Sequence, residues 1–236
     1  MGNTGRFYYL FIICMMLTSS VFARLNVPSG ATISNPAGGF VDMSCTNLNV
    51  LGSFNLNSSH VSNIENISIG PGGYLNGDQG TLTVSGSWNN NGTFAAGTGT
   101  VVLTDGCAAG PFQIVGNNVF HNLTLSSVNG KTIVIPADAN ITVNGVLNLQ
   151  GTSGQPISLV SSSGQLAKIN LGPSAQVITN SVNVSNNVQI DEPALIPAIP
   201  TLSEYGLILL VMLILCNALW RDRIISLFAK CKNLHH

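Results

Sequence analysis

The chain has 236 residues, of which 45% are hydrophobic and only 7% are charged, whereas an average soluble domain carries about 25% charged residues. Its net charge of -1 excludes a basic nucleic-acid-binding protein, because such proteins gather positive charge against phosphate. The high hydrophobic content excludes a disordered chain, and the length allows one domain of ordinary size together with targeting segments.

The N-terminal segment, residues 1–23, has the pattern of a secretory signal peptide. Arg6 supplies the positive charge, residues 7–17 form an uncharged apolar run, and Val21-Phe22-Ala23 offers a cleavage site between small residues. The apolar run is too short to cross a bilayer core of about 30 Å as a helix. We therefore expect residues 1–23 to form a signal helix that the Sec export machinery uses, and the mature chain to begin at Arg24. An uncleaved N-terminal anchor is the alternative.

Residues 24–190 alternate apolar and polar residues in short runs, for example Ile67-Ser68-Ile69 and Thr81-Leu82-Thr83-Val84. A period of two with many β-branched residues predicts strands. Asn-Gly pairs such as Asn76-Gly77 and Asn144-Gly145 separate the runs, and they adopt the positive φ angles of tight turns at little cost. This region is therefore predicted to be an exported all-β repeat domain.

One apolar residue taken from each run recurs at short steps that drift along the chain: Val50, Ile69, Val84, Val102, Leu125, Val143, Leu159, Leu171 and Val184. Steps of this size favour the coils of a right-handed parallel β-helix, in which aliphatic side chains stack inside and Asn side chains form ladders. Stacked like charges would lie about 4.8 Å apart and repel one another, which accounts for the low charge. The alternative is an antiparallel β-sandwich, because Asn-Gly turns also form hairpins.

The segment from Trp88 to Val101 resembles a unit common in repetitive bacterial surface proteins. That unit reads W-x-N-x-G-x-F-x-x-G-x-G-x-V, and each of its fixed positions is matched in this segment. The resemblance implies an exported β-repeat protein and says nothing about a ligand.

Two cysteines, Cys45 and Cys107, lie in the region predicted to be exported, while Cys14, Cys216 and Cys231 fall in the signal, the span and the tail. An even pair in an oxidising compartment favours a disulfide. A regular β-helix would separate the two by about three coils, or roughly 14 Å, whereas a disulfide needs Cα atoms within about 7 Å. We expect residues 105–111 to form a loop that reaches back and is stapled to an N-terminal cap.

The exported region offers little that suggests catalysis. Its acids are Asp42, Glu65, Asp78, Asp105 and Asp138, its histidines are His60 and His121, and the acids Asp191 and Glu192 belong to the stalk that follows. The acids are scattered in turn-like contexts, and no His or Cys spacing indicates a zinc site. We expect no catalytic residue, metal or cofactor, and therefore no enzyme.

Two functional alternatives remain open for this region. A polysaccharide-binding module would use Tyr74, Trp88, Phe94 or Phe112 as stacking platforms. A carbohydrate-active enzyme would need two carboxylates that face each other across a sugar.

The C-terminal part begins with a Pro-rich stalk at residues 191–198, which contains Pro193 and Pro197, and Pro200 follows closely. Prolines at this density favour extended chain. Residues 206–220 carry no charge and would form a helix about 22 Å long, short for a transmembrane span but sufficient. A basic tail at residues 221–236 follows, and its charges predict a cytoplasmic location. These charges are Arg221, Arg223, Lys230 and Lys232.

Residues 199–236 as a whole resemble the IPTL-CTERM sorting domain of Gram-negative bacteria. The motif at 199–206 consists of Ile199, Pro200, Thr201, Leu202, Tyr205 and Gly206. Tyr205 stands where the family usually has Trp, and the span and the basic tail follow in the family's order. The resemblance implies a precursor held in the inner membrane and processed by an exosortase-type transpeptidase.

Taken together, these patterns predict a non-catalytic structural or adhesive protein of the cell surface or the extracellular space. Its expected partners are the Sec machinery, the transpeptidase, the inner membrane and, in one alternative, a surface polysaccharide, but no nucleic acid.

Overall fold

The computed structural model describes residues 24–108, 110–191, 209–216 and 220. The chain divides into one unit at Met1–Ala194 and a second at Leu195–His236. The described strands all lie in the first unit, and among the described residues its hydrophobic core, from Val27 to Val188, consists of residues of this unit. This unit therefore contains what it needs to fold by itself. Of the second unit, residues 209–216 are helical.

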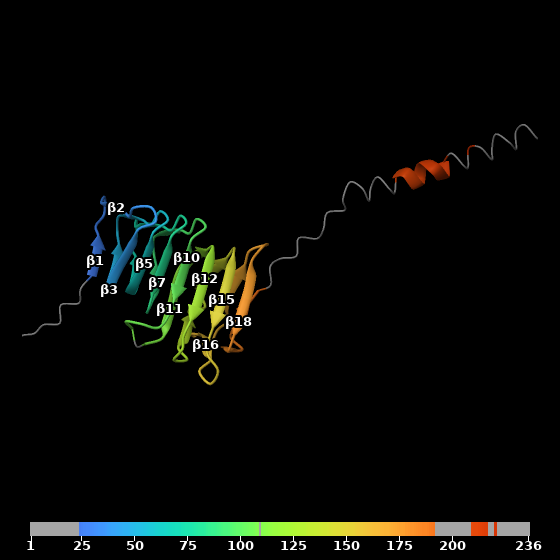
Figure 1. Cartoon of the computed structure of the whole chain (residues 1–236). Coiled ribbons are helices and arrows are strands. Elements are labelled where there is room, and N and C mark those ends of the chain that lie inside the picture. Colours follow the sequence, from blue (N-terminus) through green and yellow to red (C-terminus); the bar gives the residue numbers. More distant parts are fainter. Residues whose placement is uncertain (1–23, 109, 192–208, 217–219, 221–236) are drawn as a thin grey trace, which may run out of the picture. The chain divides into compact units, whose positions relative to one another are not determined.

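The first unit is a parallel β-solenoid of about eight coils, with its strands stacked side by side (Figure 1). Each coil passes through three columns of stacked strands, which we name A, B and C. Column A consists of β1 (Arg24–Val27), the second half of β3 (Phe40–Val50), the second half of β5 (His60–Ile69), β8 (Trp88–Asn90), the first half of β11 (Phe112–Phe120), β13 (Thr132–Ile135), β16 (Ile157–Ser161) and β19 (Val182–Val184).

Columns B and C complete each coil. Column B consists of β2 (Thr32–Ser34), β4 (Ser53–Asn55), β6 (Tyr74–Asn76), β9 (Thr93–Ala95), the second half of β11, β14 (Asn140–Val143), β17 (Ala167–Leu171) and β20 (Val188–Ile190). Column C consists of the first halves of β3 and β5, then β7 (Thr81–Val84), β10 (Thr100–Leu103), β12 (Asn122–Ser126), β15 (Val146–Gln150) and β18 (Gln176–Asn180).

All ladders between these strands are parallel, which confirms the parallel solenoid and rules out the antiparallel sandwich. The one antiparallel pairing in the described residues is an isolated bridge between Thr152 and Gln155. Asn-Gly pairs here end one strand and turn the chain into the next column, so they do not form hairpins. The right hand expected for the winding stays a prediction.

The alternating sequence produces the core because every second side chain of a strand points inward. In column C, Val61, Leu82, Val101, Leu123 and Leu147 are successive register partners, and each is at most 3% exposed. Burial of one such side chain stabilises the fold by about 1.5–3 kcal/mol. The stacked aliphatic row therefore holds neighbouring coils together.

Amide side chains form the expected ladders between coils. Asn49 Nδ2 donates to Asn26 Oδ1 at 2.8 Å, and Asn66 Nδ2 donates to Asn47 Oδ1 at 2.9 Å. An amide both donates and accepts, so identical side chains can stack without the repulsion that like charges would suffer. These contacts explain how a chain with so few charges fills its polar surface.

The coils are longer than the sequence steps suggested. Val50 pairs with Ile69, which agrees with the expected step, but Leu147 pairs with Val177, which lies much further along the chain. Ile69 and Val84, taken as marks of successive coils, lie in columns A and C of the same coil. The expected steps were too short because they mixed residues of different columns.

The middle of the solenoid contains an aromatic cluster where the ladder of column B breaks between β9 and β11. The rings of Trp88 and Phe94 lie edge to face with centroids 4.8 Å apart, and Trp88 meets Phe120 at 5.4 Å. Nearby, β11 bends from column A to column B at Gly116, whose φ is 89°. A Cβ there would lie 1.9 Å from the carbonyl oxygen of Asn90, so only glycine fits.

Several predicted segments lie outside the described residues: the signal at 1–23 and most of the stalk. Residues 209–216, inside the predicted span at 206–220, are helical. The part of the chain that the structure describes has no helix long and apolar enough to cross a membrane. The span at 206–220 stays a prediction.

Candidate functional site

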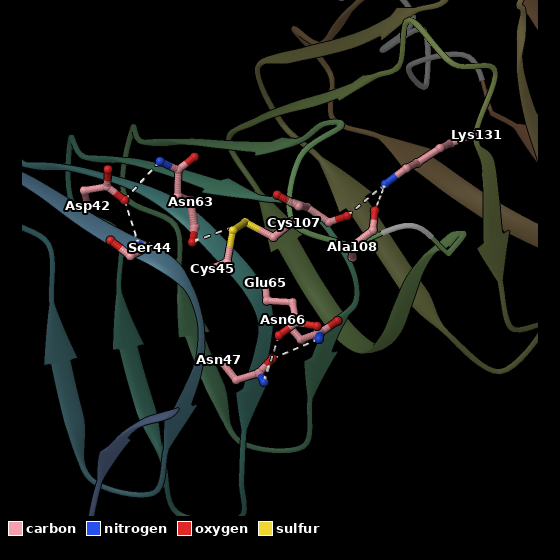
Figure 2. Close-up of a disulfide and its surroundings, with 11 residues drawn as sticks. Asp42, Ser44, Cys45, Asn47, Asn63, Glu65, Asn66, Cys107, Ala108 and Lys131 are labelled. Atoms are coloured by element: carbon pink, nitrogen blue, oxygen red, sulfur yellow. Dashed lines mark hydrogen bonds between the residues drawn. A yellow bond between two sulfur atoms is a disulfide. The ribbon is translucent and has the colours of Figure 1, made fainter. Parts of the chain in front are cut away.

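The most elaborate polar site of the described residues lies at the corner where column C turns into column A. Figure 2 shows this corner, with Cys45 in β3 and Cys107 in the segment between β10 and β11. The two cysteines form a disulfide with their Cα atoms 5.3 Å apart. Because Cys45 belongs to the first passage of this corner and Cys107 to the fourth, the disulfide ties together coils that are not neighbours.

The backbone around Cys45 departs from regular strand geometry. Ser44 and Cys45 have φ angles of 46° and 62°, and the register of β3 against β5 shifts at this point. Asp42 Oδ1 accepts the backbone N–H of Ser44 at 2.8 Å and Asn63 Nδ2 at 3.0 Å (Figure 2). These two hydrogen bonds, the one from Ser44 first, lower the pKa of the Asp42 carboxyl, because they stabilise its charged form.

The segment that carries Cys107 folds back along the solenoid. Cys107 Sγ lies 3.8 Å from the carbonyl oxygen of Asn63, one coil beyond Cys45. A Cβ on Gly106 would lie 2.6 Å from Ser85 Oγ, and one on Gly86 would lie 3.1 Å from the Cβ of Ala108. The segment therefore crosses the two intervening coils in close contact. It is a loop outside the sheets, as expected, but it is stapled to the edge of β3 and not to a separate N-terminal cap.

Lys131 anchors the same loop from the other side. Its ammonium group donates to the carbonyl oxygens of Ser85 and Ala108, lies 3.8 Å from Asp105 Oδ1, and stands 4.5 Å from the ring centre of Phe112. Its side chain is only 9% exposed. Burial lowers the pKa of Lys131, and the negative charge of Asp105 offsets part of that effect.

The carboxylate of Asp105 also stabilises the turn after β12. Its carboxylate accepts hydrogen bonds from the Ser127 hydroxyl, from the backbone N–H groups of Val128 and Asn129, and from the Asn129 amide. A cleft of about 730 Å³ opens beside this network, lined in part by Gly110, Pro111 and Val134. The polar atoms of Asp105 and Lys131 bind other groups of the protein. The corner therefore holds the loop in place.

Within the described ranges, no group of three or more His, Cys, Asp and Glu side chains could hold a metal ion. His60 stacks on Phe40 with ring centroids 5.4 Å apart. Lys168 and Asp191 form an ion pair at 4.0 Å near the C-terminal end of the solenoid.

The aromatic residues considered as sugar-stacking platforms are mostly inside the protein. Trp88 and Phe112 are completely buried, and Phe94 packs against the core. The alternative of a stacking platform was therefore wrong for Trp88 and Phe112, whereas Phe94 is partly exposed and Tyr74 is 39% exposed. Trp88 faces inward because its register partners are the buried Ile67 and Ile114, and no local sequence pattern marks that face.

The sorting residues predicted from sequence lie outside the described residues. They are Ile199, Pro200, Thr201, Leu202, Tyr205 and Gly206 of the motif, and Arg221, Arg223, Lys230 and Lys232 of the tail. Their roles therefore rest on the sequence.

Comparison with known proteins supports the C-terminal signal. Residues 197–221 match the IPTL-CTERM motif family, which implies an exported protein that an exosortase-type enzyme sorts. No curated protein and no solved structure matches the chain.

Proposed function

We propose that this chain, which carries an IPTL-CTERM motif, is a non-catalytic structural or adhesive protein of the surface of a Gram-negative bacterium. The observation that carries the proposal is the motif at 197–221, which directly follows a self-contained β-solenoid. The C-terminal signal directs the protein to its location, and the solenoid carries out the structural or adhesive role there.

The route of delivery follows from the order of the segments. The Sec machinery exports residues 24–190 after recognising the signal at 1–23, while residues 206–220 hold the precursor in the inner membrane. Residues 191–198 keep the motif accessible outside the membrane, and the transpeptidase cuts near it. The Cys45–Cys107 disulfide supports this route, because such bonds persist in oxidising compartments.

The solenoid suits a passive structural role. Its outward rows are mostly hydroxyl and amide side chains, such as Thr81, Thr100 and Asn122, which are register partners in column C. The charged network at the corner serves to fix a loop, and the larger aromatic rings fill the core. These features favour a rigid, neutral body over an enzyme or an aromatic polysaccharide-binding module.

The decisive experiment changes the sorting motif in the native host. Replacing Pro200 and Thr201 with alanine removes two residues of the motif and should leave a precursor with an uncut C-terminus in the inner-membrane fraction. The wild-type protein should be shorter and should leave that fraction. The measurement is the intact mass of the protein and its distribution between membrane fractions.

Pro193→Ala is the matched control, because it changes a proline of the stalk that lies before the matched residues 197–221. It should be processed like the wild type. If the Pro200 and Thr201 variant keeps the wild-type mass and location, the sorting proposal fails, and a simple membrane anchor remains.

A further inference from the structure

The last coil of the solenoid leaves part of the core uncovered. Val184 of β19 is the register partner of Leu159. Leu159 is fully buried, but Val184 is 45% exposed, because no further strand of the described residues covers it. Among the described strands, β19 and β20 each pair on one edge only. Column A therefore ends in an apolar row and a free strand edge.

The first coil has partly exposed apolar residues as well, although Val27 is already fully buried. Leu25 of β1 and Ile33 of β2 are only partly buried, whereas their register partners Leu48 and Phe54 are each 1% exposed. Strands β1 and β2 also pair on one edge only within the described residues. Unprotected edges of this kind are templates for pairing with another chain.

We propose that the two ends bind each other, so that the last coil of one copy stacks on the first coil of a second copy. The apolar residues of the last coil, 182–190, have the same spacing as those of the first coil, 25–33. Val182-Asn183-Val184 has the same order of apolar and polar residues as Leu25-Asn26-Val27. The interval from Val184 to Ile190 equals the interval from Val27 to Ile33, and both isoleucines pack against the core. One register therefore aligns β19 with β1 and β20 with β2.

The polar residues of the two segments are compatible with this stacking. Asn183 would stand above Asn26, which already accepts a hydrogen bond from Asn49 on its other side. The new copy would thus extend the amide ladder. Residues 25–34 carry no charge, and Asp191, the one charge of residues 182–191, already pairs with Lys168. No like charges are brought together.

The chain's own continuation is a poorer occupant of these edges. Pro193, Pro197 and Pro200 follow the last strand, and proline has no N–H to donate to a ladder. Column C ends one coil earlier, at β18, where Val177 is 40% exposed. The interface is therefore carried by columns A and B.

A contact between two different ends is heterologous, and it produces open filaments when it does not close into a ring. The inference rests on the proposed function in one respect: removal of the signal must free the edge of β1 at Arg24. A protein made to begin at Arg24 by site-specific proteolysis of a fused leader, and ending at Ala194, tests assembly independently of export and sorting.

The measurement is the molar mass in solution as a function of concentration, with electron microscopy of the largest species. The wild-type solenoid should form oligomers that grow with concentration into rods. Val184→Lys should raise the concentration needed for assembly at least about tenfold, because it places a charge in an apolar contact. Val119→Lys is the matched control: Val119 is 50% exposed on the side of the solenoid, and its variant should assemble like the wild type.

A mixture of two blocked chains identifies the geometry. Leu25→Lys blocks the first coil, and Val184→Lys blocks the last, so each variant alone should be a monomer. In a mixture, the unchanged last coil of Leu25→Lys can bind the unchanged first coil of Val184→Lys. The mixture should therefore form dimers but nothing longer. A wild type that stays monomeric overturns the proposal, as do equal effects of Val184→Lys and Val119→Lys. Dimers of Leu25→Lys alone would show a symmetric contact and also overturn it. None of these results bears on the Pro200 and Thr201 test.

Discussion

At the scale of single residues, a few buried polar side chains decide how the coils fit together. Asn118 is 1% exposed, and its Oδ1 accepts Trp88 Nε1 at 2.6 Å and Asn90 Nδ2 at 3.2 Å. Its own amide donates to the carbonyl oxygens of Val115 and Gly116, both at 3.1 Å. One side chain thus satisfies the polar groups around the aromatic cluster.

Asn118→Ala should therefore lower the free energy of unfolding by about 1–3 kcal/mol, because it leaves the buried Trp88 Nε1 without its acceptor. Urea unfolding of the solenoid measures the loss. Asn89→Ala is the control: Asn89 lies on the outward face and accepts one exposed hydrogen bond, from Asn91, so its loss should stay within about 0.5 kcal/mol. Equal losses for the two variants would contradict this account.

Asp42 provides a second test at this scale. Its folded pKa lies below the ordinary 3.8 because Ser44 and Asn63 donate to the carboxylate. Its contribution to stability is therefore present above the unfolded pKa and is lost as the pH falls through the folded pKa. In an NMR titration, Asn63→Ala should move the Asp42 midpoint upward towards 3.8. An unchanged midpoint would mean that Asn63 has no part in the shift.

At the scale of elements, the loop between β10 and β11 is held by a covalent bond on one side and by Lys131 on the other. The disulfide closes a sequence separation of 62 residues, and in the chain-entropy account such a loop stabilises the folded state by roughly 4 kcal/mol. The strands themselves do not depend on the bond, because the ladders of columns A and C run through the solenoid without interruption.

Replacing both Cys45 and Cys107 with serine should lower the free energy of unfolding by up to about 4 kcal/mol while the β-sheet circular dichroism remains. Denaturant unfolding with and without reductant measures this. Reductant should destabilise the wild type to the level of the double variant and leave the double variant unchanged. A wild type insensitive to full reduction would show that the bond adds no stability.

At the scale of the whole molecule, the proposed orientation of the precursor in the membrane depends on charges far from the solenoid in the sequence. Replacing Arg221, Arg223, Lys230 and Lys232 with glutamate should impair the cytoplasmic location of the tail, because basic residues next to a span set its orientation. A reporter fused to the C-terminus detects the side on which the tail lies. Arginine-to-lysine changes at 221 and 223 keep the charge and should have no effect. A correctly placed glutamate tail would refute the topology.

The strands, the stacked fold and the sorting signal could be predicted from residues that are close together in the chain. The alternation in Thr81–Val84 and Val146–Gln150 determined strands, because the period of two is a local property. The scarcity of charge and the Asn-rich runs indicated a stacked fold. The Ile-Pro-Thr-Leu motif and the residues after it indicated sorting, because a processing enzyme reads a short linear segment.

Only the tertiary structure decided which strands are neighbours and which side chains face inward. Leu147 pairs with Val177 across an intervening run of other strands. The sequence distance between these two residues is longer than any local pattern of alternation. Trp88 could have been a surface platform until its register against Ile67 and Ile114 placed it in the core. The path by which Cys107 reaches Cys45 likewise depends on a loop that crosses two coils. In each case the deciding interaction is between coils, because a sequence pattern reports that side chains alternate between two faces but not which face lies inside or which strand lies beside it.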